Sequence, residues 1–478
     1  MFCLFSCRAK EDSITKYPNV IFIAVDDLND WLGCMNGHPN TKTPNMDKLA
    51  SQGVLFTNAH CQAPLCGPSR ASLMTGLRPS TTGIYGMIDD NKIKTDNPAT
   101  EGIIFLPEYF KNHGYHTMGI GKLFHHHAPD GLFDESGGRY PGFGPTPKER
   151  FVWDGIGTSD PDKYGRTSTD WGAYPEVDSL MPDHHSASWT IERLNRDYKQ
   201  PFFLAVGFLR PHVPWYVPQK WFDMHPVENL KMTPYKADDL EDIPSIGHQI
   251  NDLPMMPTTE WAIENGEWAN IIQAYLACVS FVDYQVGRVL DALENSKYAD
   301  NTVIVLWSDH GYRLGEKGTF AKHALWEEAT NAPLIFAAPN LPKGKVVDSP
   351  AEMLSIYPTL LDLCGFPAYE RNEGINLVPL MHSEIPDDET YAITTFGMNN
   401  HGLRTSNYRY IQYEDGGEKL YYQNAYPNEW FNIATNPEKK AAKEKLKELL
   451  PEKNVKWNTH SSYTFQPYFV KQKERTGN

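Results

Sequence analysis

Ionisable side chains closely follow four apolar runs of the chain. Asp26 and Asp27 follow residues 19–25, Lys122 and His125 follow 115–119, Arg210 and His212 follow 201–208, and Asp309 and His310 follow 302–307. In open α/β sheets, ligands bind at the carboxyl ends of the strands. If the four runs are strands of one such sheet, these side chains share one edge, and that edge is the candidate site.

Three carboxylates and an imidazole in this set could hold a metal ion. Asp26, Asp27 and Asp309 offer oxygen ligands, and His310 offers a ring nitrogen. Carboxylate oxygens suit hard cations such as Ca²⁺ or Mg²⁺ better than zinc. Either pair alone is more typical of a helix cap or of loop carboxylates, but together the two pairs predict a cation site.

The elements that must position these groups alternate along the chain. Apolar runs at 19–25, 201–208, 302–307 and 333–337 are typical of strands buried on both faces. Helical patterns lie at 43–53, 106–114 and 267–294, and the longest has apolar residues spaced by three and four. This alternation predicts an α/β fold with a large mixed, mostly parallel sheet flanked by helices.

Two regions depart from this alternation. Residues 126–185 are rich in Gly, Pro, Asp and Tyr without periodicity, which predicts an irregular insertion over the sheet edge. After about residue 375, short antiparallel strands are expected at 392–396, 402–405, 408–413 and 419–422, followed by a charged helix at 438–450. We therefore expect an N-terminal segment 1–17, a main domain 18–375 and a smaller α+β C-terminal subdomain 376–478.

Charge and cysteine content narrow the class of protein. With 60 acidic and 44 basic residues, the formal net charge is -16, which argues against nucleic acid as a partner because phosphate binding needs a basic surface. An anionic substrate would therefore need a local cluster of cations. The seven cysteines are sparsely spaced and form no disulfide framework or zinc-ribbon pattern.

The N-terminus allows two interpretations. Residues 1–7 are short and apolar, and Leu4-Phe5-Ser6-Cys7 is similar to a bacterial lipobox, in which the cysteine carries a lipid. On this interpretation residues 1–17 are the remnant of a lipoprotein signal and linker. The protein would then be exported, in the periplasm or at the outer membrane of a bacterium, with a lipid anchor at Cys7. The alternative is an unprocessed N-terminus.

The most specific pattern starts at Cys66. The segment Cys66-Gly-Pro-Ser-Arg70, followed by Thr75-Gly-Leu-Arg78, resembles the signature of the sulfatase family, Cys-x-Pro-Ser-Arg and Thr-Gly-x-Arg. The resemblance covers roughly residues 18–435 and is closest to iduronate-2-sulfatase-like members. Matching segments also surround Asp26, Lys122, His212, Asp309 and Lys322.

The resemblance implies an alkaline-phosphatase-like fold and a modified cysteine. In the family, a maturation enzyme oxidises this cysteine to formylglycine, whose aldehyde is hydrated to a geminal diol. One hydroxyl attacks sulfur, and the other later expels sulfate. Carried over by position, the metal ligands are Asp26, Asp27, formylglycine 66, Asp309 and His310, and the metal is one Ca²⁺ ion.

The resemblance also implies roles for the other polar residues. Arg70 would orient the diol, and His125 would help its collapse. Lys122 and Lys322 would neutralise charge on the sulfate oxygens. His212 would protonate the leaving alcohol, and Asp309 could accept the proton of the nucleophile.

The expected substrate is a sulfated sugar or uronic acid of a polysaccharide or oligosaccharide. Arg210, Arg404 or His401 could bind its carboxylate, and His184 and His185 could touch it, whereas His126 and His127 are expected in a solvated loop. One alternative function is a phosphoester or phosphonate monoester hydrolase of the same superfamily. The other is a non-catalytic glycan-binding relative, although no nucleophile or metal ligand is missing here.

Overall fold

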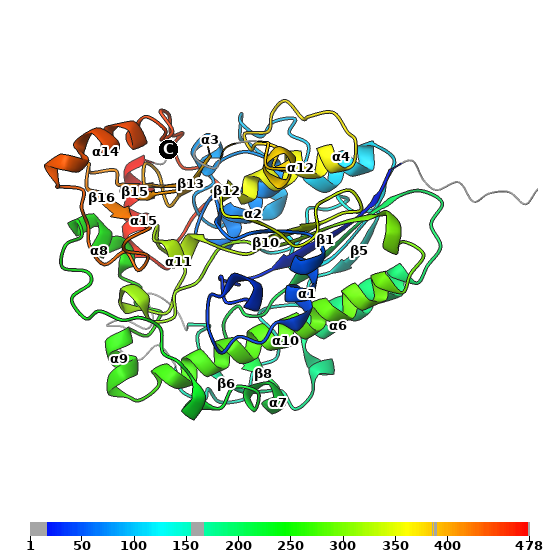
Figure 1. The fold of residues 1–478 in the computed structure, drawn as a ribbon, viewed down its shortest axis with the longest axis horizontal. Helices are drawn as coiled ribbons and strands as arrows, with labels where there is room; N and C mark the ends of the chain where they lie inside the picture. Colours follow the sequence, from blue (N-terminus) through cyan, green and yellow to red (C-terminus); the bar gives the residue numbers. More distant parts are fainter. Residues whose placement is uncertain (1–16, 154–166, 385, 387–389, 477–478) are drawn as a thin grey trace, which may run out of the picture.

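The computed structural model describes residues 17–153, 167–384, 386 and 390–476. An eight-stranded sheet forms its centre, in the order β11-β2-β10-β9-β1-β7-β4-β5 (Figure 1). Its strands are β1 (Asn19–Val25), β2 (Val54–Phe56), β4 (His116–Gly121), β5 (Glu135–Gly138), β7 (Phe202–Phe208), β9 (Thr302–Ser308), β10 (Leu334–Ala337) and β11 (Lys345–Val347). The expected N-terminal segment, including Cys7, lies almost wholly outside the described residues.

The sheet is mixed but mostly parallel, so the predicted fold class is confirmed. β1 pairs in parallel with β7 and β9, and β4 pairs in parallel with β7 and β5. Only β10, among the described strands of this sheet, runs against its neighbours β9 and β2. The carboxyl ends of β1, β4, β7 and β9 therefore lie at one edge, as the spacing of ionisable residues predicts.

The central strands are apolar on both faces because helices cover both. Ile21, Ile23 and Val25 of β1 belong to one buried cluster, and Val20 and Phe22 belong to the other. Each side chain of this size stabilises the fold by about 1.5–3 kcal/mol when fully buried. Successive side chains of β1 point to opposite faces and therefore pack against the two helical layers in turn.

The helical layers contain most of the fourteen described α-helices. These are α1 (Pro44–Gln52), α2 (Cys66–Thr75), α3 (Pro79–Thr82), α4 (Leu106–Asn112), α6 (Pro182–Leu194), α7 (Gln219–Phe222), α8 (Ser245–Asn251), α9 (Thr259–Glu264), α10 (Trp268–Glu294), α11 (Glu327–Thr330), α12 (Ile356–Leu363), α13 (Val378–Met381), α14 (Lys440–Lys447) and α15 (Pro467–Thr476). Helices α1, α6 and α10 lie on one side of the sheet, and α2, α4 and α12 lie on the other (Figure 1). No helix in the described part of the chain has the length and apolarity needed to span a bilayer.

The stretch 126–185 is more regular than predicted. It contains β5, which adds an edge strand to the main sheet, and β6 (Trp171–Ala173), which pairs in parallel with β8 (Trp215–Val217). Its last residues begin helix α6. The prediction of an irregular insertion is therefore wrong for these segments. Strand β5 could not be predicted because its sequence, Glu-Ser-Gly-Gly, has no apolar residue.

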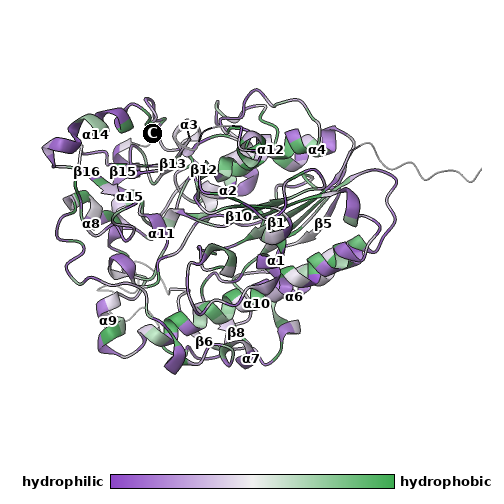
Figure 2. Cartoon of the chain, in the orientation of Figure 1, coloured by the Kyte–Doolittle hydropathy of each residue, from purple (hydrophilic) through white to green (hydrophobic). Residues whose placement is uncertain are grey.

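The C-terminal region forms a second, smaller sheet. Its antiparallel order is β13-β14-β15-β16, and the strands are β13 (Tyr391–Thr395), β14 (His401–Thr405), β15 (Tyr408–Gln412) and β16 (Glu418–Tyr422). This matches the expected small antiparallel C-terminal sheet. Helix α14 beside it is mostly hydrophilic (Figure 2), but its Leu446 is buried in a cluster with residues of this sheet. The exact boundary at 375 stays a prediction.

The C-terminal region contacts the rest of the chain in two ways, through backbone hydrogen bonds and through charged side chains. The short strands β3 (Ala59–His60) and β12 (Ala351–Glu352) pair next to β13, and the amide of Met87 donates to the carbonyl of Ser462 at 2.8 Å. Charged side chains fill a second contact, the interface cluster, which comprises Asp30, Glu316, Glu327, Glu328, Arg404, Arg409 and Glu429. A cavity of about 600 Å³ lies against part of this cluster.

Candidate active site

Cys66 lies at the first position of helix α2, which follows Leu65 in extended conformation. The positive end of the helix dipole therefore points toward this residue. The helix ends at Gly76, whose φ of 75° suits glycine. A side chain there would also meet Asn372, because a Cβ would lie 1.8 Å from its Oδ1. The Thr-Gly of the signature thus fixes how α2 ends, and with it the direction of its first turn.

Three side chains surround the Cys66 sulfur. Its Sγ lies 3.3 Å from Nε2 of His310 and 3.8 Å from Oδ1 of Asp27. The ammonium of Lys322 donates to the same sulfur at 3.4 Å. The four residues come from the turn after β1, the start of α2, the turn after β9 and the loop before α11, so the fold brings distant parts of the sequence to one atom.

Three carboxylates in this cluster are matched by three cations. Nε of Arg70 donates to Asp309 at 2.8 Å, and Nη2 donates to Asp26 at 3.1 Å. Lys122 also contacts Asp26, and Lys322 donates to both oxygens of Asp27 at 2.7 and 2.9 Å. All six side chains are buried. We call these six residues together with Cys66 and His310 the catalytic cluster.

The backbone at the end of β1 is shaped to present Asp27. This residue has a φ of 61°, an uncommon left-handed conformation in which Asp is enriched. Its amide donates to Oδ1 of Asp309 at 3.2 Å, and its carbonyl accepts from the hydroxyl of Tyr275 at 2.8 Å. Helix α10, which carries Tyr275, therefore holds the turn in place.

The donor set fits a divalent cation. Ligand atoms of Asp26, Asp27, Cys66 and His212 lie within 4.8 Å of one another, and so do those of Cys66, Asp309 and His310. Burial raises the pKa of Asp27, and its neighbours Asp26 and Asp309 raise it further against the effect of Lys322. A bound cation would remove this penalty, because an opposite charge favours the ionised carboxyl. The five predicted metal ligands thus lie together.

Arg70 contacts the carboxylates and the backbone around Cys66. Besides Asp26 and Asp309, its guanidinium contacts the carbonyl of Lys122. Its hydrogen bonds go to two candidate metal ligands and to the backbone of the Lys122 loop, whereas none recorded for it goes to Cys66. Its position supports a role in orienting the carboxylates.

His212 and His125 flank the catalytic cluster. Nδ1 of His212 lies 2.6 Å from the carbonyl of Val213, and its Nε2 lies 4.0 Å from Asp27. Because a carbonyl oxygen can only accept a hydrogen bond, Nδ1 carries the hydrogen and donates it, and Nε2 faces the cluster. Burial lowers the pKa of His212, and Lys322 and Lys122 lower it further. His125 is half-buried, with an Nδ1 that has no partner among the described residues.

The three residues suggested for binding a substrate carboxylate are engaged elsewhere. Arg210 is buried and donates to the carbonyls of Tyr216, His212 and Phe143. Arg404 pairs with Glu327 in the interface cluster. His401 is buried in β14 next to Thr395. None of these side chains is free to bind a substrate in this structure.

The remaining candidate histidines lie in two places. His184 and His185 are in the first turns of α6, rather than in a loop. His126 and His127 are exposed, as expected, and their backbone amides donate to Asp90. The structure brings none of these four imidazoles into recorded contact with the catalytic cluster.

Two residues near the cluster were missed because they lie in the stretch 126–185. Phe143 stacks on His212, with ring centroids 4.5 Å apart and planes 6° apart. Arg139 contacts the carbonyl of His125 and donates to that of His126 at 3.0 Å. The only sequence signal for Arg139 is its position after Gly137 and Gly138, which resembles Lys122 after Gly121.

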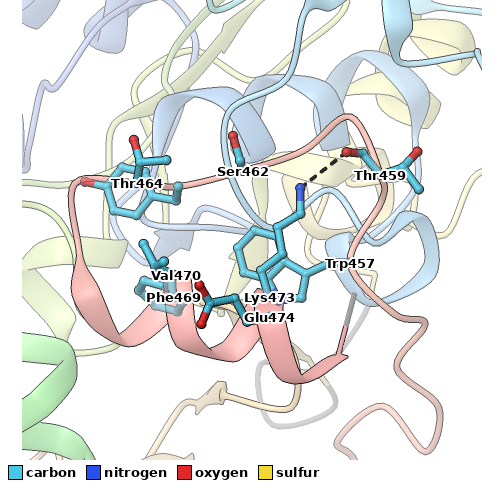
Figure 3. Close-up of a pocket in the computed structure, with 9 residues that line it drawn as sticks. Trp457, Thr459, Ser462, Thr464, Phe469, Val470, Lys473 and Glu474 are labelled. Atoms are coloured by element: carbon cyan, nitrogen blue, oxygen red, sulfur yellow. Dashed lines mark hydrogen bonds between the residues drawn. The ribbon is translucent and has the colours of Figure 1, made fainter. Parts of the chain in front are cut away.

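Residues of the C-terminal segment line a separate pocket. It has a volume of about 350 Å³, and Trp457, Phe469 and Lys473 are among its lining residues (Figure 3). Tyr463, which also lines it, lies with its hydroxyl 2.6 Å from Nε2 of His323, the neighbour of Lys322. Lys473 contacts the carbonyls of Thr459 and Ser461, so it is already occupied.

Comparison with known proteins agrees with this geometry. Residues 18–366 match the family described as Sulfatase, and residues 315–456 match the family described as N-sulphoglucosamine sulphohydrolase, C-terminal. The chain is 65% identical over 480 residues to a sulfatase of Formosa agariphila, and the aligned region covers 99% of this chain and 95% of that protein. It is 31% identical over 433 residues to the iduronate 2-sulfatase of Homo sapiens, and the aligned region covers 79% of this chain and 74% of that protein.

Solved structures share the fold. One, of a protein in complex with its substrate D-glucosamine-2-N,6-O-disulfate, has a TM-score of 0.69 at 22% identity and covers 91% of this chain and 97% of that chain. The similarity in fold extends over the main sheet and the C-terminal region alike. The family match covers most of the chain and includes every residue of the catalytic cluster. The chain belongs to the sulfatase family.

Proposed function

We propose that this sulfatase removes sulfate from a sulfated sugar or uronic acid by means of a formylglycine made from Cys66. The observation that carries the proposal is the convergence of His310, Lys322 and Asp27 on the sulfur of Cys66, at 3.3, 3.4 and 3.8 Å. Buried cations and metal ligands around one potential nucleophile are the arrangement that attack on an anionic ester requires.

The unmodified thiol would be a poor nucleophile here. Burial raises the pKa of Cys66 to about 12, so the thiolate is scarce at neutral pH. A formylglycine at this position supplies a hydrated aldehyde with two hydroxyls, of which one attacks sulfur and the other expels sulfate. The proposal therefore includes a maturation enzyme as a partner.

The acidic ligand set supports calcium as the metal. Asp26, Asp27 and Asp309 provide hard oxygen ligands, and His310 and residue 66 complete the set. Bound there, a calcium ion would supply positive charge opposite the sulfate oxygens. We expect chelation of calcium to lower the rate strongly and to lower the thermal unfolding temperature, and addition of Ca²⁺ to restore both. An unchanged rate after verified metal removal would contradict this ligand set.

The other residues take distinct roles in the proposal. Lys122 and Lys322 stabilise negative charge on the sulfate group. Protonated Nε2 of His212 donates a proton to the leaving oxygen, since Nδ1 is held by Val213. The pKa of His212 is low in the free chain, but an anionic sulfate beside it favours the protonated ring. His125, close to Lys122 and Asp26, assists release of sulfate.

The substrate and the cellular place of the enzyme are part of the proposal. The similarity to an iduronate 2-sulfatase supports a sulfated uronic acid or a related sugar of a glycan. Export to the periplasm or outer membrane of a bacterium, with a lipid on Cys7, is proposed from the sequence Leu4-Phe5-Ser6-Cys7.

Comparative turnover tests the proposed function. Protein produced with a formylglycine-generating enzyme is assayed for release of sulfate from 4-nitrophenyl sulfate and a panel of sulfated sugars, and for release of phosphate from 4-nitrophenyl phosphate. We expect sulfate release to be faster by orders of magnitude. Faster phosphate release would favour the alternative of a phosphoester or phosphonate hydrolase, and sugar binding without any turnover would favour a non-catalytic relative.

A further inference from the structure

Arg139 reaches the catalytic edge of the sheet through β5. This edge strand runs parallel to β4, and Gly138 pairs with Ile120. Arg139, the residue after β5, therefore lies beside the segment that follows β4, which includes Lys122 and His125. Because parallel strands deliver their next residues to the same edge, the chain places a third basic residue next to the predicted sulfate-binding lysine.

The guanidinium of Arg139 is held without being neutralised. One nitrogen contacts the carbonyls of His125 and His126. No carboxylate among the described residues lies within ion-pair distance of it, although the side chain is half-buried. Burial lowers the pKa of Arg139, and Asp26 and Cys66 act against burial from nearby. A half-buried charge without a counter-ion is unfavourable unless an anion binds it.

The nitrogens of the other cations around the site are more fully engaged, whereas only Nη1 of Arg139 has a recorded hydrogen bond among the described residues. Arg210 is enclosed by backbone carbonyls, Arg404 pairs with Glu327, and Lys473 contacts two carbonyls. Arg70, Lys122 and Lys322 are matched with carboxylates of the catalytic cluster. Among the described basic residues at this edge, Arg139 is thus the best placed to meet an additional negative charge.

The segment that carries Arg139 also contacts the leaving-group side of the site. Four residues later, Phe143 stacks on His212, and its carbonyl accepts from Arg210 at 3.1 Å. Phe143 also lines a pocket of about 390 Å³. Residues 139–143 therefore connect the His125 side of the cluster with the His212 side, where the leaving oxygen departs.

We propose that Arg139 binds an anionic group, a carboxylate or a second sulfate, on the sugar that carries the scissile sulfate. This inference rests on the proposed function and deepens it by naming a charge that the substrate must carry. Guanidinium groups bind carboxylate and sulfate with paired hydrogen bonds. In a chain of net charge -16, such a local cation offsets the repulsion of a substrate that bears two negative charges.

Substrate pairs that differ by one charge test the inference. The wild type, R139Q and R139K are compared on a 2-O-sulfated uronic acid and its carboxyl-reduced counterpart, and on glucosamine 2-N,6-O-disulfate and N-acetylglucosamine 6-O-sulfate. 4-Nitrophenyl sulfate reports the chemistry alone. The matched control is K48Q, which removes one positive charge from an exposed site on α1.

We expect R139Q to lower kcat/KM about ten- to hundredfold on the doubly charged member of one pair. Its singly charged partner and 4-nitrophenyl sulfate should change by less than about threefold, and R139K should recover part of the loss. Which pair responds distinguishes a carboxylate from a second sulfate. K48Q should leave every substrate unchanged.

Two results would overturn the inference. Equal losses on all substrates would assign Arg139 only to bracing the His125 loop, and a wild type without preference for the doubly charged sugars would remove the need for the cation. Absence of sulfate release from every ester by the wild type is a different result, because it would contradict the proposed function itself.

Discussion

The catalytic cluster and the interface cluster are both buried and charged, but they are built differently. Around Cys66, each carboxylate meets a cation, and a sulfur lies at the centre. In the interface cluster, Arg404 and Arg409 clamp Glu327, whereas the neighbouring Glu328 has an oxygen without a partner among the described residues. Burial of charge is thus common to both regions, and only the catalytic cluster contains a thiol.

Adjacent glutamates in the interface cluster show how partners decide the state of a buried acid. Arg404 and Arg409 outweigh burial and lower the pKa of Glu327. Burial raises the pKa of Glu328, and Glu429 and Glu316 raise it further. A perturbed pKa alone would therefore mark both regions as candidate sites. The chemistry of Cys66 and its position at the end of the sheet distinguish the catalytic one.

The largest effect is expected from C66S. Loss of the formylglycine precursor should lower turnover of every sulfate ester by at least about a thousandfold, whereas folding should be retained because the change is nearly isosteric. The measurement is sulfate release together with thermal unfolding. C364S, which alters another buried thiol, is the matched control and should remain active. Full activity of C66S would end the assignment of the nucleophile.

The next effect is selective for the leaving group. H212Q should slow release from sugar sulfates by about 10²–10⁴-fold, the usual contribution of a general acid. On 4-nitrophenyl sulfate, whose leaving group needs no proton, the loss should be under about tenfold. Steady-state kinetics on both substrates measure the contrast, with the exposed H185Q on α6 as control. Equal losses on both substrates would show that His212 does not act as the acid.

In the interface cluster, loss of a charged side chain should lower the free energy of unfolding and leave turnover nearly unchanged. R409M removes the partner of Glu327 and Glu429, and breaking a buried ion pair from one side costs about 3–5 kcal/mol. Chemical denaturation should show this loss, while kcat of the folded protein stays within about twofold. A large loss of kcat without a loss of stability would mean that the two regions are not distinct in function.

The smallest effect depends on pH. Burial raises the pKa of Asp30 to about 7, with help from Glu316 and Glu327. Between pH values of about 4 and 7 the folded chain therefore binds more protons at Asp30 than the unfolded chain, so its contribution to stability falls as pH rises. D30N lacks this titration and should be more stable than the wild type at pH 8 by about 1–2 kcal/mol.

The same comparison at pH 4 provides the control for D30N. There Asp30 is protonated in the folded chain and about half protonated in the unfolded chain, whose pKa is near 3.8, so most of the penalty is absent and the advantage of D30N should shrink toward zero. Denaturation midpoints at the two pH values measure the difference. An advantage that is equal at both, or larger at pH 4, would contradict the sign of this shift.

Strongly apolar or periodic segments could be predicted well from the sequence. The run at 19–25 coincides with β1, and the pattern at 267–294 agrees with α10 to within one residue. The carboxyl-end rule then brought Asp26, Asp27, Asp309 and His310 to one edge. These predictions succeed because a strand buried on both faces is a continuous apolar run and an amphipathic helix has apolar residues at regular spacing.

What the sequence could not predict depends on tertiary contacts. β5 has no apolar residue and exists because β4 offers it an edge, so Arg139 could not be placed. Arg210 and Arg404 looked available until their carbonyl and carboxylate partners were known. Stacking of Phe143 on His212 joins residues far apart in the sequence. Partners of this kind leave no local pattern.

Mass spectrometry of the tryptic peptide that contains residue 66 tests the central claim most directly. The protein is produced with a formylglycine-generating enzyme, and sulfate release is measured on the same sample. The account predicts an aldehyde at residue 66 and a rate that rises with the modified fraction. An unmodified Cys66 in a sample that releases sulfate at full rate would contradict it.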